Sequence, residues 1–423
     1  MGFTVTYFLS FAFLLLVQNP SLDSTSPKER QAAVEKMAVL GNHDAIPKLA
    51  EALKKEPKSD IRAEMVAALG RIRDKDAIPV LADTLRTDLD KNVRSQAINS
   101  ILRLYIVIED SGPLTNIFNK AKSVLVETDP PMVGPEVQVD TAAKEALSSA
   151  MQKDFTEEVR AEAARALGSL RAKDQIPVMT AALQDPQNQE HRAVRATIVH
   201  TLGVLRDSSA GPALERALRD PDRQVVLEAV RAVGLVGDTS ARPTLENMFR
   251  TSSSGPLRAR ALESLALLRD PANTPLFESL LDNNDDYYRE LAAEGLARVK
   301  YPGAKDWKTR LDQEKKPNVR NALAYGLAAA GNVEYINNLA NALDSRQAYQ
   351  VEVYLYELGK FDGQLNELYR YLQSTNPKVR AGMARVIGNI GDPSSADQLR
   401  ALSNDPNTDV VREGVAALRK LVK

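Results

Sequence analysis

Cysteine is missing from this sequence of 423 residues, and histidine occurs only three times. Without thiols the chain forms no disulfide and no cysteine-ligated zinc or iron–sulfur centre, and it has no thiol nucleophile. His43, His191 and His200 are scattered, and none has a second ligand at the spacing of a helical metal site. The HExxH, GxSxG, GxxxxGK[ST] and GxGxxG motifs are also missing. The sequence therefore predicts no catalytic, cofactor-binding or metal-binding residues.

A surplus of basic charge is lacking too. Lys and Arg total 55 against 56 for Asp and Glu, so the formal net charge is −1. Proteins that hold nucleic acid by its phosphates usually carry excess positive charge, and nucleic acid is therefore not expected as a partner. Aromatic residues make up only 5%, which favours cores built from Ala, Leu and Val.

The first 17 residues contain no charged side chain, and residues 8–17 (FLSFAFLLLV) are almost entirely apolar. Such a short apolar run resembles the hydrophobic part of an export signal, although no basic residue precedes it and no Ala-x-Ala-like cleavage site follows it. Fifteen residues span about 22 Å as a helix, less than the roughly 30 Å of a bilayer core. We expect residues 1–27 to be an export signal or membrane tether and the protein to be exported, periplasmic or envelope-associated. The alternative is a cytoplasmic protein whose apolar end packs on its first repeat.

One phrase recurs along the rest of the chain. A Val-Arg pair is followed by Ala, then Leu-Gly, then Asp, and then a Pro that opens a second apolar stretch, as in IRAEMVAALGRIRDKDAIPVLADTL from Ile61 and VRATIVHTLGVLRDSSAGPALERAL from Val194. Apart from one gap, the recurrences are 30 to 35 residues apart. The position after the Val holds Arg30, Arg62, Arg94, Arg160, Arg195, Val226, Arg258, Arg289, Arg320, Gln350, Arg380 and Arg412. A fixed period of this length indicates a repeat array.

Each repeat reads as two helices. Val194, Ile198 and Leu202 recur at helical spacing and form the apolar face of the first helix. The Gly after Leu either ends that helix or allows a neighbour to approach closely. Turn aspartates at 207, 238, 270 and 392 can cap the next helix, and prolines at 47, 79, 177, 212, 243 and 275 fit its first turn. Because such a pair cannot bury its apolar face alone, neighbours must stack. The expected fold is an all-α solenoid of about twelve stacked antiparallel helix pairs.

The phrase V-R-x-x-A…L-G…D…P resembles that of HEAT repeats, in particular the short variety of about 31 residues known from phycobilisome lyases. The resemblance covers residues 28 to 423 and implies a superhelix with an extended concave surface. Most members of the family are protein-binding scaffolds, and minorities bind nucleic acid or carry out chemistry. The iron-binding hydroxylases of this type use repeated His-Glu pairs, and this chain contains none.

The role of the arginine in each repeat has two interpretations. A row of arginines can bind phosphates or carboxylates of a ligand. Alternatively, each Arg pairs with turn carboxylates or carbonyls of a neighbouring repeat and forms a structural ladder, which is the reading we favour because one Arg at a fixed place in each repeat suits stacking. The segments Asp282–Asp286 and Asp405–Asp409 imitate the start of a calcium loop but lack its Gly and Glu, so we expect inter-repeat turns there.

The register breaks between Arg94 and Arg160. Residues 128–139 (TDPPMVGPEVQV) contain three prolines, which exclude a continuous helix. We divide the chain into residues 1–27, HEAT-like repeats at 28–127, a degenerate repeat with a Pro-rich inserted loop at 128–155, and HEAT-like repeats at 156–423. The inserted loop is expected to be solvated, with a partner-docking role as the alternative.

Ten of the twelve tyrosines lie between Tyr287 and Tyr371, together with the single tryptophan. Tyr354 and Tyr356 are two residues apart on a helix and cannot face the same core. An exposed aromatic patch is therefore one hypothesis, and bulkier packing of diverged repeats is the other. The candidate partner-binding residues are Tyr287, Tyr288, Trp307, Tyr354, Tyr356, Tyr369 and Tyr371.

Three function classes follow. The preferred one is a non-enzymatic scaffold that mediates protein–protein interaction in the cell envelope and binds a protein or peptide. The second is a bilin-lyase-like enzyme or pigment chaperone, which rests on the family resemblance alone. The third is a nucleic-acid-binding HEAT-like clamp, which would need a basic stripe. The residues four past each second-helix proline form no such stripe: they are Glu51, Asp83, Ala181, Arg216, Asn247 and Ser279.

Overall fold

The computed structural model describes residues 20–106, 132–134 and 137–421. These residues contain helices and no strand. No helix among them is long and apolar enough to cross a membrane, and the apolar segment at residues 1–17 lies outside them. The chain divides into two units, residues 1–127 with 140–166 and residues 128–139 with 167–423. The expected all-α solenoid of HEAT-like pairs is confirmed.

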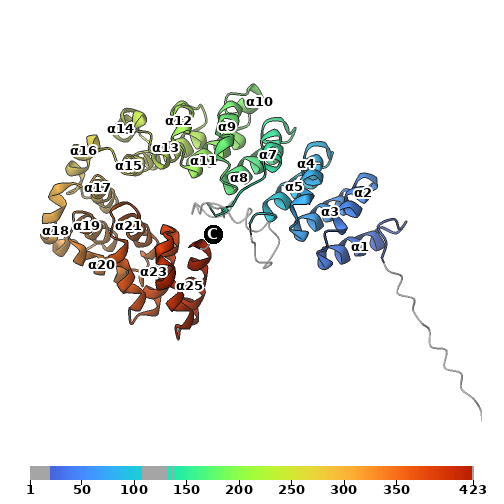
Figure 1. The fold of residues 1–423 in the computed structure, drawn as a ribbon. Coiled ribbons are helices and arrows are strands. Elements are labelled where there is room, and N and C mark those ends of the chain that lie inside the picture. Colours follow the sequence, from blue (N-terminus) through green and yellow to red (C-terminus); the bar gives the residue numbers. More distant parts are fainter. Residues whose placement is uncertain (1–19, 107–131, 135–136, 422–423) are drawn as a thin grey trace, which may run out of the picture. The chain divides into compact units, whose positions relative to one another are not determined.

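The first unit is a stack of helix pairs (Figure 1). Its helices are α1 (Pro27–Leu40), α2 (Ala45–Lys55), α3 (Ser59–Ile72), α4 (Ile78–Thr87), α5 (Lys91–Arg103), α7 (Thr141–Lys153) and most of α8 (Glu157–Ser169). The first helices α1, α3 and α5 pack on one another, and the second helices α4 and α7 do the same. Helix α7 therefore takes the place of the second helix in the pair that α5 begins.

The second unit continues the same scheme (Figure 1). Its first helices are α11 (Arg192–Leu205), α13 (Arg223–Val236), α15 (Gly255–Leu267), α17 (Asp286–Arg298), α19 (Pro317–Ala329), α21 (Ala348–Phe361), α23 (Pro377–Ile390) and α25 (Thr408–Leu421). The second helices are shorter: α9 (Ile176–Ala182), α12 (Gly211–Ala217), α14 (Arg242–Thr251), α16 (Thr274–Leu280), α18 (Lys308–Gln313), α20 (Ile336–Ala342), α22 (Leu365–Tyr369) and α24 (Ala396–Arg400). A single turn, α10 (Pro186–Gln189), precedes α11. Each first helix contacts the next one along the chain from α11 to α25.

The turn between the two helices of a pair has the chemistry that the sequence predicts. The carboxylates of Asp207, Asp238, Asp270 and Asp392 each accept a backbone N–H two residues on, at the start of a 3₁₀ turn. Proline then stands in the first turn of the second helix, for example Pro212 in α12 and Pro243 in α14. The missing proline N–H costs nothing there because that group has no partner within a helix.

The recurring glycine serves close approach rather than helix ending. Gly203 lies inside α11, and a Cβ on it would be 2.8 Å from the Cα of Ala232 in α13. The same crowding holds for Gly234 in α13, where a Cβ would be 2.8 Å from the Cα of Ser264. The first helices thus pack backbone to backbone at these points, and a side chain at either position would force them apart.

This packing makes Gly203→Ala a test of the stack. Alanine favours a helix over glycine by about 1 kcal/mol, while overpacking costs about 1–3 kcal/mol. We expect the substitution to lower the free energy of unfolding of the second unit by about 1–2 kcal/mol, measured by urea denaturation. Gly255→Ala is the matched control, because a Cβ there meets nothing within 4 Å. Equal stability of the two variants would contradict the close-packing role.

The Pro-rich insertion is partly packed against the protein. Residues 128–131, 135 and 136 lie outside the described residues, but Val133 is buried. Its N–H donates to the carbonyl of Ser169 at 2.8 Å, and its carbonyl accepts from Nε of Arg171 at 2.8 Å. The expectation of a solvated loop is therefore wrong at Val133, because two backbone hydrogen bonds and an apolar side chain fix it to the end of α8.

Candidate functional site

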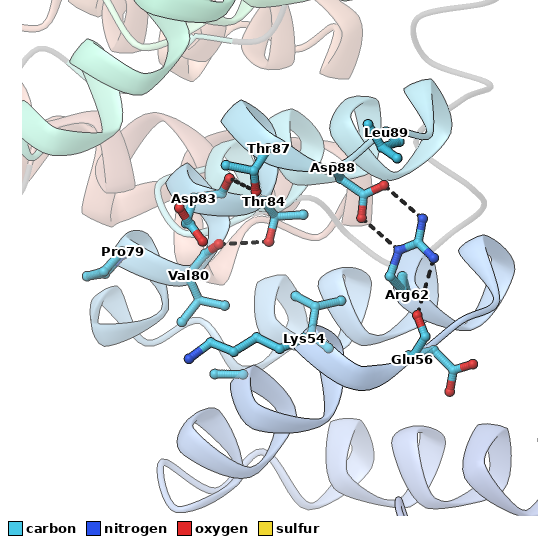
Figure 2. A pocket seen from close by; sticks show the side chains of 12 residues that line it. Lys54, Glu56, Arg62, Pro79, Val80, Asp83, Thr84, Thr87, Asp88 and Leu89 are labelled. Carbon is cyan, nitrogen blue, oxygen red and sulfur yellow. Dashed lines mark hydrogen bonds and ion pairs between the residues drawn. The ribbon is translucent and has the colours of Figure 1, made fainter. Parts of the chain in front are cut away.

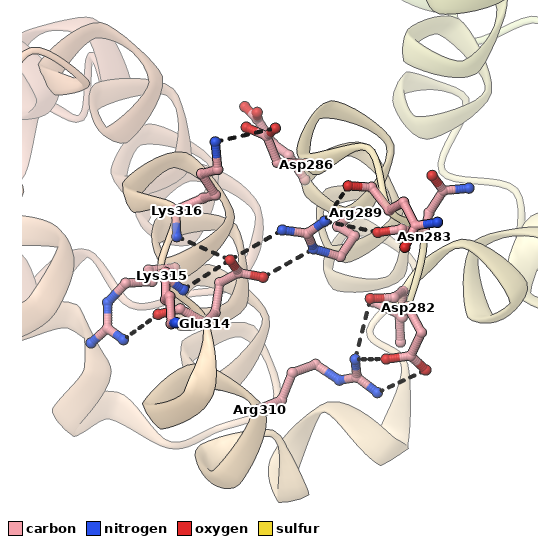
Figure 3. Close-up of polar contacts among 12 residues, drawn as sticks. Asp282, Asn283, Asp286, Arg289, Arg310, Glu314, Lys315 and Lys316 are labelled. Carbon is pink, nitrogen blue, oxygen red and sulfur yellow. Dashed lines mark hydrogen bonds and ion pairs between the residues drawn. The ribbon is translucent and has the colours of Figure 1, made fainter.

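The arginine in each repeat is a structural rung. The guanidinium of Arg62 donates to both carboxylate oxygens of Asp88, at 2.7 and 2.9 Å, and to the carbonyl of Glu56 (Figure 2). It also donates to the carbonyl of Pro57. One side chain thereby ties the start of its own helix to the linker that leads into the next repeat. Figure 3 shows the equivalent rung between Arg289 and Glu314, at 3.0 and 3.1 Å.

Six such rungs occur in the part of the chain that the structure describes. They are Arg30–Glu56, Arg62–Asp88, Arg94–Asp154, Arg195–Asp220, Arg289–Glu314 and Arg380–Asp405. The partner carboxylates follow the second helix, and they are not the turn aspartates that cap it. At Arg258 and Arg320 the corresponding places hold Asn283 and Ser345, and no carboxylate is available. The ladder reading is therefore confirmed at these six positions, and their guanidinium groups are not free to bind a ligand.

The two calcium-like segments are turns, as expected. The carboxylate of Asp285 caps α17 by accepting the N–H of Tyr287 at 3.0 Å. Asp282, which follows α16, pairs with Arg310 in α18 of the next repeat (Figure 3). Asp405 is the partner of Arg380, whose hydrogen bonds hold the pKa of that carboxyl below its ordinary value.

The structure also brings His43 next to Asp74 and Asp76, which the sequence did not indicate because they belong to successive repeats. Nδ1 of His43 lies 2.6 Å from Oδ2 of Asp74, and Nε2 lies 3.6 Å from Oδ2 of Asp76. The hydrogen bond to Asp74 raises the pKa of His43. Asp74 also accepts the N–H of Asp76 at 2.9 Å as a cap. Since this group is largely exposed and its carboxylate already has a capping role, it acts as an ion pair between repeats.

The seven predicted aromatic residues do not form one patch. Trp307, Tyr354 and Tyr371 are buried, so the expectation of exposure is wrong for these three. Trp307 packs over Gly326, where a Cβ would be 2.5 Å from the indole ring. The ring of Tyr354 stacks on that of Tyr325 with centroids 4.7 Å apart. Tyr325 and Tyr354 fill the space between α19 and α21, as the alternative of bulkier packing proposed.

The other four predicted residues are partly exposed, and of these only Tyr287 and Tyr288 have rings in contact, with centroids 6.3 Å apart. Tyr287 donates its hydroxyl to Glu263, and Tyr288 packs edge-on against Phe249 with centroids 5.7 Å apart. The hydroxyl of Tyr369 is 2.9 Å from Oγ of Ser395. Tyr356 lines a large pocket. As the sequence predicts, Tyr354 and Tyr356 face different directions.

That pocket is the best candidate site in the described residues. It has a volume of about 600 Å³ and lies within the second unit, between the ends of α13 and α15 on one side and α21 on the other. Its walls are formed by Arg206, Gly234, Leu235, Gly237, Leu267, Leu268, Arg269, Tyr349, Glu352, Val353, Tyr356, Glu357, Phe361 and Asn389. We call it the α21 pocket. Two of its aromatic side chains are open to solvent, Tyr349 at 78% and Phe361 at 54%.

A buried polar cluster fixes the geometry of this pocket. The carboxylate of Glu357 in α21 accepts from Arg298 at 3.1 Å, from Arg269 at 3.1 Å and from the hydroxyl of Tyr325 at 2.6 Å. Arg298 lies in α17, Arg269 follows α15 and Tyr325 lies in α19. Side chains from three earlier repeats therefore converge on one carboxylate. Glu294 pairs with Arg298 at 2.9 Å and accepts the hydroxyl of Tyr354. The row of first helices is therefore curved tightly enough for α21 to reach the end of α15.

The charges in this cluster balance. Burial alone would raise the pKa of Glu357, but the guanidinium groups of Arg298 and Arg269 outweigh it and hold the pKa below its ordinary value. Burial likewise opposes the charge of Arg298, and Glu294 and Glu357 raise its pKa. Glu357 is thus a paired anion and not a free base.

Glu290 behaves differently, because burial raises its pKa to about 7 and the charge of Glu294 adds to the effect. A raised carboxyl pKa stabilises the fold below pH 4.5, and this stability is lost as the pH rises through about 7. We expect the second unit to lose about 1–2 kcal/mol between pH 5 and 8 from this group, after allowance for solvent screening. Glu290→Gln should lose less over the same range in urea denaturation. Identical pH profiles for the two proteins would contradict this assignment.

A second pocket lies in the first unit, between α2 and α4, and has a volume of about 550 Å³ (Figure 2). Its polar side chains already have partners. Thr84 donates to the carbonyl of Val80 at 2.8 Å, Thr87 donates to the carbonyl of Asp83 at 2.8 Å, and Asp88 belongs to a rung. It therefore offers less to a ligand than the α21 pocket does.

Sequence reasoning noted the aromatic interval but missed most of the α21 pocket. Arg206, Leu235, Leu267 and Asn389 lie at the ends of first helices from four different repeats. The position of these residues at helix ends could be predicted from the sequence. Their convergence in space could not, because it depends on the rotation from each repeat to the next.

Comparisons with known proteins agree with the repeat pattern. The family described as HEAT repeats matches residues 20–101, 187–266, 273–354 and 352–419, and the PBS lyase HEAT-like repeat matches residues 159–185. No match is found among curated proteins. Similar solved structures include the Escherichia coli protein YibA, with 18% identity over 66% of this chain and 90% of that chain and a TM-score of 0.42. The complex of CpcE and CpcF of phycocyanin lyase from Nostoc has 20% identity over 66% and 92%, with a TM-score of 0.36. Human deoxyhypusine hydroxylase has 16% identity over 82% and 96%, with a TM-score of 0.29. At these values, nothing about the activity of this chain follows from the likeness.

Proposed function

This chain belongs to the HEAT-repeat family, and from that premise we propose that it is a non-enzymatic scaffold that binds a segment of a partner protein in the α21 pocket. The observation that carries the proposal is the exposure of Tyr349 and Phe361 around a concave space of about 600 Å³. Burying an aromatic side chain of this size contributes about 1.5–3 kcal/mol, so two of them can provide much of the affinity for a peptide.

The polar groups of the pocket support binding over catalysis. The carboxylate of Glu352 pairs with Arg385, with Nε at 3.1 Å, and Glu357 pairs with Arg298 and Arg269. Neither is a free general base. The hydroxyls of Tyr349 and Tyr356 have no hydrogen-bond partner within the described ranges, so both remain available to the backbone of a bound segment.

The test is site-specific photo-crosslinking in the native host. Benzoylphenylalanine at position 349 should crosslink one partner protein, which mass spectrometry identifies. The matched control is the same probe at Leu89, which is 86% exposed but belongs to the first unit. Phe361→Ala should reduce the adduct at 349 several-fold while leaving the exchange of α21 amide hydrogens unchanged. The same adducts at 349 and 89 would count against the pocket. A coloured small-molecule adduct would favour the pigment-handling alternative instead.

We further propose that the protein works at the cell envelope, on the strength of the apolar residues 8–17. Fractionation of cells that express a carboxyl-terminally tagged chain should find it in the envelope or periplasm. Deletion of residues 2–17 should return it to the cytoplasm. An unchanged distribution would instead support the alternative in which this segment packs on the first repeat.

A further inference from the structure

Basic residues occupy an unusual backbone conformation at the ends of the first helices. Within the described part of the chain, all five non-glycine residues with positive φ are basic: Arg73, Arg171, Arg206, Arg269 and Lys300. Other repeats place Gly41, Gly237 or Gly391 at the same point, with φ of 59°, 75° and 71°. A side chain in this left-handed region costs about 1 kcal/mol relative to glycine. A basic side chain held there at such a cost should make a compensating contact.

Three of the four such residues in the second unit make that contact within the protein. Nε of Arg171 donates to the carbonyl of Val133 at 2.8 Å. Arg269 pairs with Glu357 at 3.1 Å, and Lys300 pairs with Asp362 at 3.1 Å. Each contact joins segments that are far apart in the sequence, so these three basic residues help to hold the curvature of the unit.

Arg206 is the exception. Its φ is 49°, its side chain is exposed, and its guanidinium has no hydrogen bond or ion pair to any described residue. It lines the α21 pocket together with Leu235 and Tyr349. The other cation of the pocket, Arg269, is neutralised by Glu357 and lies over the ring of Phe361 at 4.5 Å. Arg206 therefore leaves one uncompensated positive charge beside an apolar and aromatic surface.

We propose that the α21 pocket selects a peptide in which an Asp or Glu side chain lies next to a large apolar or aromatic one. The apolar side chain packs against Tyr349 and Phe361, and the guanidinium of Arg206 donates to the carboxylate. This inference rests on the proposed peptide-binding function and adds to it the chemistry of the bound segment. A charge-assisted hydrogen bond of this kind is shorter and stronger than a neutral one, and it rewards an acidic ligand specifically.

The experiment is a selection of random displayed dodecapeptides on the immobilised full-length protein. Peptides enriched on the wild type should carry Asp or Glu within about three residues of an aromatic or large aliphatic residue. Arg206→Gly should bind these peptides at least tenfold more weakly, and Asp→Asn or Glu→Gln in the peptide should produce the same loss on the wild type but little further loss on Arg206→Gly. Glycine suits the left-handed backbone at position 206, so this variant should melt at the wild-type temperature or above.

Arg73→Gly is the matched control, because it makes the same chemical change at the same backbone conformation in the first unit and should bind like the wild type. Enriched peptides without acidic residues, or equal binding to Arg206→Gly, would overturn the inference. If peptides without acidic residues bound the wild type and bound Tyr349→Ala more weakly, the peptide-binding function would stand and only the acidic preference would fail. If no peptide were enriched at all, the proposed function itself would fail.

Discussion

Replacing Arg94 by alanine should lower the free energy of unfolding of the first unit by about 3–5 kcal/mol, because it leaves a buried carboxylate without its partner. The side chains of Arg94 and Asp154 are only 1% and 3% exposed, and they are joined by two hydrogen bonds of 2.7 and 3.0 Å. Arg94 also donates to the carbonyls of Asp88 and Leu89 and lies 3.9 Å from the ring centroid of Phe155. The loss is measured by urea unfolding, with hydrogen exchange to locate it in α5 and α8.

Arg412→Ala is the control for this prediction. Arg412 has the same place in its repeat, but its side chain is 69% exposed and pairs only with neighbours in its own helix. Exposed pairs of this kind contribute about 0–1 kcal/mol, so little change is expected. Similar losses for the two variants would mean that burial does not decide the strength of a rung.

Replacing Glu357 by alanine should have an equally large effect on the second unit, about 3–5 kcal/mol. The change leaves the hydroxyl of Tyr325 and the guanidinium of Arg269 without their acceptor, and it leaves Arg298 with Glu294 alone. The amide hydrogens of α17, α19 and α21 should all exchange faster, because all three helices meet at this carboxylate. The ring of Phe361 should also gain mobility, since Arg269 is no longer fixed over it.

Glu367→Ala and Glu357→Gln are the controls for this prediction. Glu367→Ala removes a carboxylate from α22 that is 43% exposed and lies 3.8 Å from Arg370, and it should cost less than about 0.5 kcal/mol. Glu357→Gln should be less stable than the wild type only at pH values at which the native carboxyl is charged. Because the folded pKa of Glu357 is lowered, the advantage of the wild type is present above pH 4.5 and disappears as the pH falls through that lower value. A cost independent of pH would point to lost packing instead of lost charge.

The sequence anticipated the repeat well because the relevant interactions are local. The helix starts are marked by Asp207 and Pro212, and the apolar face by Val194, Ile198 and Leu202. All five lie within one repeat. The arginine rung was also expected. Its carboxylate acceptor was predicted to lie in a turn, but in the structure the acceptor follows the second helix. Both places offer carboxylates in the sequence, and only packing decides which of them the guanidinium reaches.

Local sequence patterns did not predict which aromatic residues between Tyr287 and Tyr371 are buried. Helical spacing separated Tyr354 from Tyr356 correctly, but it did not say which of them is buried. Trp307 became core because Gly326 in the next repeat leaves room for an indole ring. That choice depends on a residue 19 positions away, and no pattern around Trp307 announces it.

The helix pairs, their period, their caps and the recurring arginine position thus follow from the sequence alone. The convergence of α15, α17, α19 and α21 on Glu357, with the α21 pocket beside them, depends on the tertiary structure. The reason is geometric. Each repeat is fixed by contacts with its neighbour, but the meeting of residues three repeats apart depends on the sum of small rotations between successive pairs, and that sum is not written at any one position.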